Sequence, residues 1–322
     1  MSDANPILAA LASPDVQERR VALTRVEEYL DVIPVSALIA RLQDGDAVVR
    51  RLAAYALEEL GDPEAIPALL DASGDDDADV QTAARTALRQ FRAPDAVPFL
   101  VAGVSHPHPG ARETALLSLR DHRAPASEAA LAAASDDSHA AVRREAVIAL
   151  GYLRAPATVP ALLKRFKDED AAVRRAAVGA AVAFIPDIPA YIFAGARQDG
   201  DWQVRREAVI ALSHFPAVDA GNKIAAALGD TAWQVVKEAA LAAGKLKLPL
   251  LAELLPLLQR PEPDLRKVSA WALGEAGDAG ALPDLHALIA DPDGDVRKTA
   301  ARSAAKLSDA VSGPIDSRNH HP

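Results

Sequence analysis

The side chains of this sequence that are best suited to chemistry are three histidines with aspartates beside them. His106 and His108 lie two residues apart, His139 follows His108 after 31 residues, and Asp136 and Asp137 precede His139. Imidazoles joined by a carboxylate can form a metal site, and a histidine can also act as a pH switch. The alternative is that histidine replaces an acidic residue that caps a helix, and the sequence leaves these three interpretations open.

A second segment has acidic residues at the spacing of calcium ligands. Asp291, Asp293 and Asp295 alternate with other residues, but the twelve-residue calcium loop with its final glutamate is absent. The chain has no cysteine. It also has no phosphate-binding loop, no His-Glu-x-x-His motif and no Gly-x-Ser-x-Gly motif. We therefore predict no catalytic residues and no cofactor, and the histidines are the only metal candidates.

The elements that carry these residues repeat along the chain. One slot, occupied mostly by valine, recurs in steps of 31 residues, with a single step of 30. Self-similarity at this period predicts a solenoid, in which each unit packs only on its neighbours. The occupants of the slot are Glu18, Val49, Val80, Ala111, Val142, Val173, Val204, Val235, Leu265 and Val296.

Each repeat predicts a pair of helices. In one repeat, apolar residues at helical spacing predict helix A over residues 157–166 and helix B from about Ala172, with Asp170 as the N-cap of helix B. A column of prolines lies inside helix A, where each proline should bend the helix. That column is Pro67, Pro98, Pro160 and Pro283, whereas repeat six has Pro186 and Pro189, so its helix A should be displaced or shortened. The predicted fold is all-α, a right-handed α-solenoid (α-α superhelix) of about ten 31-residue helical hairpins.

Composition limits the class of partner. A formal net charge of -10 argues against nucleic acid. The first residues lack the features of a signal peptide, and no apolar run is long enough to span a membrane. We expect a cytoplasmic protein without a membrane partner, formed by one repeat array over residues 1–308 and a disordered tail over residues 309–322.

Three features together resemble HEAT repeats: the helix pair, the proline in helix A, and an aspartate followed by Val-Arg at the start of helix B. The short period is similar to that of phycobilisome-lyase HEAT-like (PBS lyase HEAT-like) proteins. The resemblance implies that helix B lines the concave side, and that aspartates and arginines of successive repeats form a ladder along the stack. The expected ladder acids are Asp15, Asp46, Asp77, Asp170, Asp201, Glu262 and Asp293, and the arginines are Arg19, Arg50, Arg112, Arg143, Arg174, Arg205, Arg266 and Arg297.

Two further columns of helix B fall outside its apolar face. The residue after each ladder arginine is basic in eight of ten repeats, which predicts a positive stripe. The residue four positions further on is apolar or aromatic in six repeats. An acidic, partly apolar protein surface would fit this pair of columns. The candidate partner-binding residues are Arg144, Arg175, Arg206, Lys237 and Lys267, with Ile148, Ile210, Leu241 and Trp271.

A pair of tryptophans adds to this candidate surface. Trp202 and Trp233 occupy the same slot in repeats seven and eight, and repeat eight has Ala232 and Val236 in place of both ladder residues. Tryptophan is enriched at binding hot spots, so two indoles one repeat apart could stack or form a shelf for a partner. The alternative is that they cover apolar surface where the ladder is interrupted.

These features together favour a non-enzymatic scaffold that binds another protein along helix B, in an accessory, assembly or regulatory role. Two alternatives stay open. The resemblance implies a bilin-lyase-like enzyme or lyase subunit, and His108 with His139 would make the chain a metal-binding protein.

Overall fold

The computed structural model describes residues 6–185 and 187–312. Every regular element in these ranges is helical, and none of the described helices combines the length and apolar character that crossing a lipid bilayer requires. The helices follow one another in pairs, and their contacts group them into two compact units, residues 1–183 and 184–322. The single array over residues 1–308 therefore stays a prediction.

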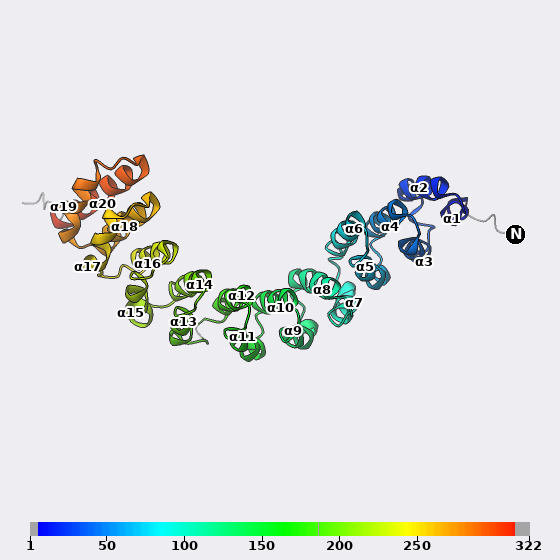
Figure 1. The fold of residues 1–322 in the computed structure, drawn as a ribbon, viewed down its shortest axis with the longest axis horizontal. Coiled ribbons are helices and arrows are strands. Elements are labelled where there is room, and N and C mark those ends of the chain that lie inside the picture. Colours follow the sequence, from blue (N-terminus) through cyan, green and yellow to red (C-terminus); the bar gives the residue numbers. More distant parts are fainter. Residues whose placement is uncertain (1–5, 186, 313–322) are drawn as a thin grey trace, which may run out of the picture. The chain divides into compact units, whose positions relative to one another are not determined.

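In its described part, the first unit contains six helix pairs, with helix A in one row and helix B in a second row (Figure 1). Helix A is α1 (Pro6–Leu11), α3 (Val35–Ile39), α5 (Ile66–Ala72), α7 (Val97–Gly103), α9 (Glu128–Ala134) and α11 (Val159–Arg165). Helix B is α2 (Val16–Thr24), α4 (Ala47–Leu60), α6 (Ala78–Leu88), α8 (Pro109–His122), α10 (Ala140–Leu153) and α12 (Ala171–Ala181).

The second unit continues the same pattern with four pairs among its described residues. Helix A is α13 (Ala190–Ala196), α15 (Ala217–Ala227), α17 (Leu251–Leu254) and α19 (Leu282–Leu288). Helix B is α14 (Trp202–Leu212), α16 (Trp233–Lys245), α18 (Pro263–Ala276) and α20 (Gly294–Ser312). Residues 309–312 of the predicted tail are thus helical, and residues 313–322 lie outside the described residues.

The prolines of helix A do not bend it, because they lie at its start. Pro67 and Pro160 fall in the first turn of α5 and α11, where the missing N–H removes no hydrogen bond. A 3-10 turn precedes each of these helices. In repeat six, α13 has 7 residues, as α11 has, so the helix is not shortened. Its 3-10 turn, η7, follows α12 directly and does not run into α13. The 3-10 turns are η1 (Val26–Tyr29), η2 (Ala40–Gln43), η3 (Pro63–Ala65), η4 (Pro94–Ala96), η5 (Pro125–Ser127), η6 (Pro156–Thr158), η7 (Val182–Phe184), η8 (Leu255–Gln259) and η9 (Ala279–Ala281).

The valine slot forms the core between the two rows. Val49 and Val173, for example, have no exposed surface, whereas Glu18 at the first repeat is exposed. Small residues let neighbouring B helices approach closely, since a Cβ on Gly151 of α10 would lie 2.8 Å from Cβ of Ala180 on α12. The stack therefore consists of many thin, tightly packed layers.

An arginine–aspartate ladder joins successive repeats, as expected, but its aspartates are not the predicted ones. Arg143 Nε and Nη2 donate to the two carboxylate oxygens of Asp168 at 2.9 and 2.8 Å. Its Nη1 donates to the carbonyl oxygen of Asp137 in its own repeat at 2.9 Å. Each rung thus joins two layers by a bidentate ion pair. Rungs of this kind include Arg19–Asp44, Arg50–Asp75, Arg112–Asp137, Arg143–Asp168, Arg205–Asp230 and Arg266–Asp291.

The predicted ladder acids, two residues further along, cap helix B instead. Asp170 Oδ1 accepts hydrogen bonds from the backbone N–H groups of Ala172 and Val173 at 2.8 and 3.1 Å. A capping side chain is held against its own helix, and Asp170 does not pair with the ladder arginine of the preceding repeat. Asp46 caps α4 and also accepts hydrogen bonds from Arg20 of the preceding repeat, at 3.0 and 2.6 Å. The same capping is made by Asp15, Asp46, Asp77, Asp201 and Asp293, but not by Glu262.

The ladder lowers the pKa of its carboxyl groups. Hydrogen bonds from Arg50, Arg205 and Arg266 hold the pKa of Asp75, Asp230 and Asp291 below the usual value. These carboxylates are therefore charged throughout the neutral range, as the ladder requires.

Two rungs are interrupted, and in both cases both partners change. Gln81 replaces the arginine opposite His106, and Val236 replaces the arginine opposite Arg260. Gln81 keeps the backbone contact of the ladder, since its Nε2 donates to the carbonyl oxygen of Asp75 at 2.6 Å. Removing both partners leaves no ladder charge buried alone, which is the costly outcome.

Candidate partner-binding surface

The basic column lies on helix B, but acidic side chains balance most of it. Arg144 Nη2 lies 3.0 Å from Glu145 Oε1 and 3.5 Å from Glu113 Oε1. In the second unit Arg206 pairs with Glu238 at 2.8 Å. These contacts correct the expectation of a positive stripe. Glu113 occupies the column itself one repeat before Arg144, whereas Glu145 and Glu238 lie on the same and on the next helix B at other positions.

The other three candidate residues of the column are Lys237, Lys267 and Arg175. Lys237 and Lys267 share Asp264, with Nζ–Oδ distances of 2.7 and 3.3 Å. Arg175 on α12 is exposed. Surface ion pairs of this kind contribute little to stability, so a partner can replace one of their members at low cost.

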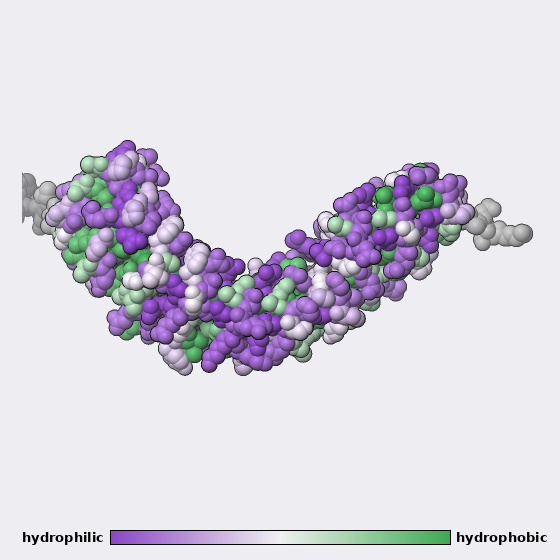
Figure 2. Space-filling model, viewed as in Figure 1, coloured by the Kyte–Doolittle hydropathy of each residue, from purple (hydrophilic) through white to green (hydrophobic). Residues whose placement is uncertain are grey.

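The apolar column is half-buried rather than enclosed. Ile148 on α10, and Ile210 and Leu241 on α14 and α16, each keep part of their surface open to solvent. Trp271 is also half-buried, and its ring packs so closely on α16 that a Cβ on Gly244 would overlap it. The face of the molecule in Figure 2 is mostly polar, with small hydrophobic patches between polar side chains.

The two tryptophans begin successive B helices but do not stack. Trp202 and Trp233 are the first residues of α14 and α16, and both are half-buried. The described residues contain no ring contact between them, and Trp233 lies 6.0 Å from the Lys237 ammonium instead. This contact extends the mixed basic and apolar surface to the start of helix B.

The histidines are not brought together, and they do not replace the capping aspartates. His106 Nε2 lies 2.9 Å from Asp71 Oδ1, and His139 Nδ1 lies 2.9 Å from Ser138 Oγ. His108 and His139 precede α8 and α10 without a side-chain cap. Across residues 6–185 and 187–312, no three histidine or acidic side chains are grouped to hold a metal ion.

The aspartates with calcium-like spacing are used by the fold. Asp291 accepts the ladder hydrogen bonds of Arg266 at 2.8 and 2.9 Å, and Asp293 Oδ1 accepts from the backbone N–H groups of Asp295 and Val296. Capping and the ladder therefore account for this acidic segment, since helix N-termini favour negatively charged side chains.

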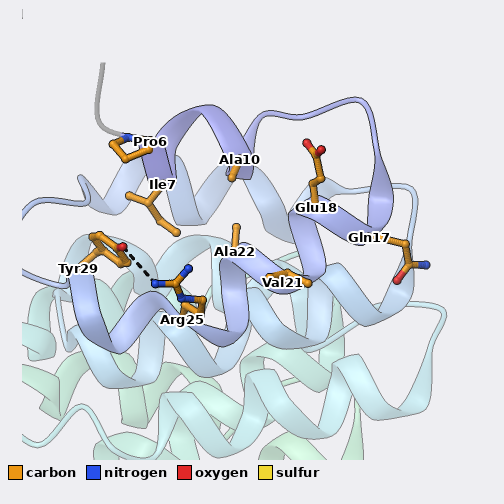
Figure 3. A pocket seen from close by; sticks show the side chains of 9 residues that line it. All are labelled: Pro6, Ile7, Ala10, Gln17, Glu18, Val21, Ala22, Arg25 and Tyr29. Atoms are coloured by element: carbon orange, nitrogen blue, oxygen red, sulfur yellow. Dashed lines mark hydrogen bonds between the residues drawn. The ribbon is translucent and has the colours of Figure 1, made fainter. Parts of the chain in front are cut away.

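A cavity of about 350 Å³ lies between α1, α2 and η1 (Figure 3). Ile7 and Val21 contribute apolar surface, and Arg25 Nη2 donates to Tyr29 Oη at 3.4 Å across one side. The lining residues of the cavity are Pro6, Ile7, Ala10, Gln17, Glu18, Val21, Ala22, Arg25 and Tyr29.

A cluster of one tyrosine ring and two arginines was not predicted from the sequence. Tyr152 lies near the end of α10, with the guanidinium carbons of Arg120 and Arg123 at 5.5 and 5.4 Å from its ring centroid. The available signal was the recurrence of arginine at steps of 31 residues just after helix B, at Arg92, Arg123 and Arg154.

Comparison with protein families matches the chain to HEAT repeats over residues 4–89, 72–138, 127–192, 189–255 and 251–315. Comparison with curated proteins gives no match.

Solved structures share the fold at low sequence identity. An engineered protein is 21% identical, with a TM-score of 0.51, and covers 96% of this chain and 100% of its own. Yeast importin-beta (Kap95p) is 16% identical, with a TM-score of 0.66 over 98% of this chain and 52% of that chain. A Kap121p mutant is 15% identical, with a TM-score of 0.72 over 96% of this chain and 42% of that chain. This chain thus spans about half the length of the two Kap proteins.

Proposed function

The chain belongs to the HEAT-repeat family, and from this premise we propose that it is a non-enzymatic scaffold that binds another protein along its helix B face. One observation carries the proposal: half-exposed apolar side chains recur beside weakly paired basic ones on successive B helices. Ile210 follows Arg206 by one helical turn on α14, and Leu241 follows Lys237 in the same way on α16.

The chemistry of this face favours an acidic, partly apolar partner. Apolar side chains of the partner would cover the half-exposed column, and its carboxylates would replace Glu238 or Asp264 as partners of the basic residues. Kap95p, a structural neighbour, is known in a complex with Nup1, which supports protein binding as a use of this fold.

The proposal is tested by reversing charges on and off helix B. Arg175→Glu and Arg206→Glu change two exposed residues of the face, and Arg25→Glu with Lys164→Glu is the matched control elsewhere on the surface. Arg206 loses its surface ion pair with Glu238, and Arg25 and Lys164 lose theirs with Glu28 and Asp136. Exposed ion pairs contribute little to stability, so both variants should keep the stability of the parent.

The readout is affinity purification from the source cells, followed by quantitative mass spectrometry. We expect the proteins that the parent enriches to be depleted at least tenfold with the helix B variant and retained with the control. Equal capture by both variants would show that this face does not bind the partner.

The narrower assignment to the phycobilisome-lyase HEAT-like subclass rests on the 31-residue period. It predicts a stable complex with an open-chain tetrapyrrole, visible as a shifted absorption band on mixing. An unchanged pigment spectrum would remove the bilin-lyase alternative and leave the scaffold proposal intact.

A further inference from the structure

A row of arginines follows the B helices of three successive repeats in the first unit. Arg92 follows α6, and Arg123 and Arg154 are the C-cap residues of α8 and α10. Together with Arg89, Arg120 and Tyr152 we call this set the C-terminal edge. It lies at one end of helix B, and the basic column lies nearer the start of these helices. Glu145 lies between the two, 3.9 Å from Arg120 of the edge and 3.0 Å from Arg144 of the column.

The backbone at this position is unfavourable for arginine. Arg123 and Arg154 have φ values of 49° and 57°, in the left-handed region that favours glycine. Other repeats place glycine at the same position, Gly61 with φ 68° and Gly277 with φ 81°. Arginine is therefore retained here against a conformational cost, which is typical of a functional position.

The guanidiniums of the edge are available to a ligand. Arg89, Arg123 and Arg154 are exposed, and none of them forms an ion pair with any residue that the structure describes. Arg92 pairs with Asp121 at 3.0 Å while its side chain stays 58% exposed. Tyr152 is 44% exposed and lies against two guanidiniums, so it orients them and offers an aromatic surface beside them.

We propose that the C-terminal edge is a second docking site, which binds an extended acidic segment of a protein partner. Packed helices lie about 8–10 Å apart, so the arginines of successive repeats recur at about this spacing. An extended chain advances about 3.3 Å per residue, so every third residue of the segment meets the next arginine. The expected ligand has acidic residues at positions one, four and seven. The net charge of -10 disfavours nucleic acid as the occupant.

The test is fluorescence anisotropy with the full chain and two labelled peptides of equal composition. One peptide carries glutamate at every third position, and the other carries the same glutamates side by side. We expect saturable binding of the first peptide and at least about fivefold weaker binding of the second. Arg123→Gly and Arg154→Gly should each weaken the first by about tenfold, as loss of a charged hydrogen bond does.

Glycine variants separate binding from folding, because glycine suits this backbone. Arg123→Gly and Arg154→Gly should melt at least as high as the parent, by up to about 2 °C more. Lys247→Gly is the matched control, since Lys247 has φ 51° at the same position in the second unit. It should keep peptide binding unchanged. Equal affinity for the two peptides, equal loss with Lys247→Gly, or tighter binding of a single-stranded oligonucleotide would overturn the proposal.

Discussion

The most buried rung of the ladder gives the sharpest prediction about stability. The Arg143 and Asp168 side chains are only 6% and 2% exposed. Asp168→Asn keeps the shape of the side chain, and its oxygen can still accept the backbone N–H of Asp170, which lies 3.0 Å from Oδ1. The substitution therefore removes the charge while it preserves the turn before α12.

The expected cost follows from what Arg143 retains. Removing one member of a buried ion pair costs about 3–5 kcal/mol. Arg143 keeps its carbonyl acceptors, Asp137 and Ser138, and a contact of 3.2 Å with the exposed Glu169 carboxylate. We therefore expect the low end of the range, about 3 kcal/mol, which corresponds to about a hundredfold loss of amide protection.

Hydrogen exchange with mass spectrometry can locate this loss, because repeat arrays open locally. Protection should fall in α10 and α12 and stay unchanged in α2. Glu28→Gln, which removes the solvent-exposed pair with Arg25, should change nothing measurable. A loss below about tenfold in α10 and α12, or an equal loss in every helix, would refute the assignment of the ladder as the joint between layers.

Three further predictions follow from the same contacts. The ladder aspartates have lowered pKa values, mainly through their arginine hydrogen bonds. Their contribution to stability is therefore complete above about pH 4 and is lost as the pH falls through their folded-state pKa. A denaturant midpoint that does not fall on the acid side of a pH titration would contradict this. Repairing an interrupted rung with Gln81→Arg and His106→Asp should stabilise the chain by about 1–3 kcal/mol more than the sum of the two single changes, and strict additivity in a double-mutant cycle would show that no rung forms. Gly244→Ala should destabilise the chain by about 1–3 kcal/mol through overlap with Trp271. Gly195→Ala, with no atom near its added Cβ, should stabilise it by up to about 1 kcal/mol. Thermal melting should show changes of melting temperature with opposite signs for the two variants, and equal signs would contradict the packing.

The repeat and its helices could be predicted from the sequence because period and capping are local properties. Asp170 caps α12 as its position before the apolar run indicated, and α11 and α12 occupy the predicted segments. The HEAT-repeat resemblance is confirmed by the family match. These features depend on residues a few positions apart, which the spacing of one repeat displays.

The acidic partner predicted for the ladder arginines was wrong for a geometric reason. Asp168 and Asp170 both recur every 31 residues, and only the position of the neighbouring layer decides which one reaches Arg143. The charge of the basic column was misjudged in a similar way, since Glu238 and Asp264 pair with Arg206 and Lys237 from the next helix B. Contacts between layers depend on how the helices pack, and a column of aligned residues does not contain that information.

The most direct test of protein binding along helix B is photo-crosslinking from two apolar positions of the second unit. A photoreactive amino acid at Ile210 lies on helix B, and one at Val218, which is 90% exposed on α15, lies on helix A. In source cells, we predict a discrete crosslinked protein from Ile210 and none from Val218, although Val218 is the more exposed. Crosslinks from Val218 alone, or equal crosslinks from both positions, would contradict helix B as the binding face.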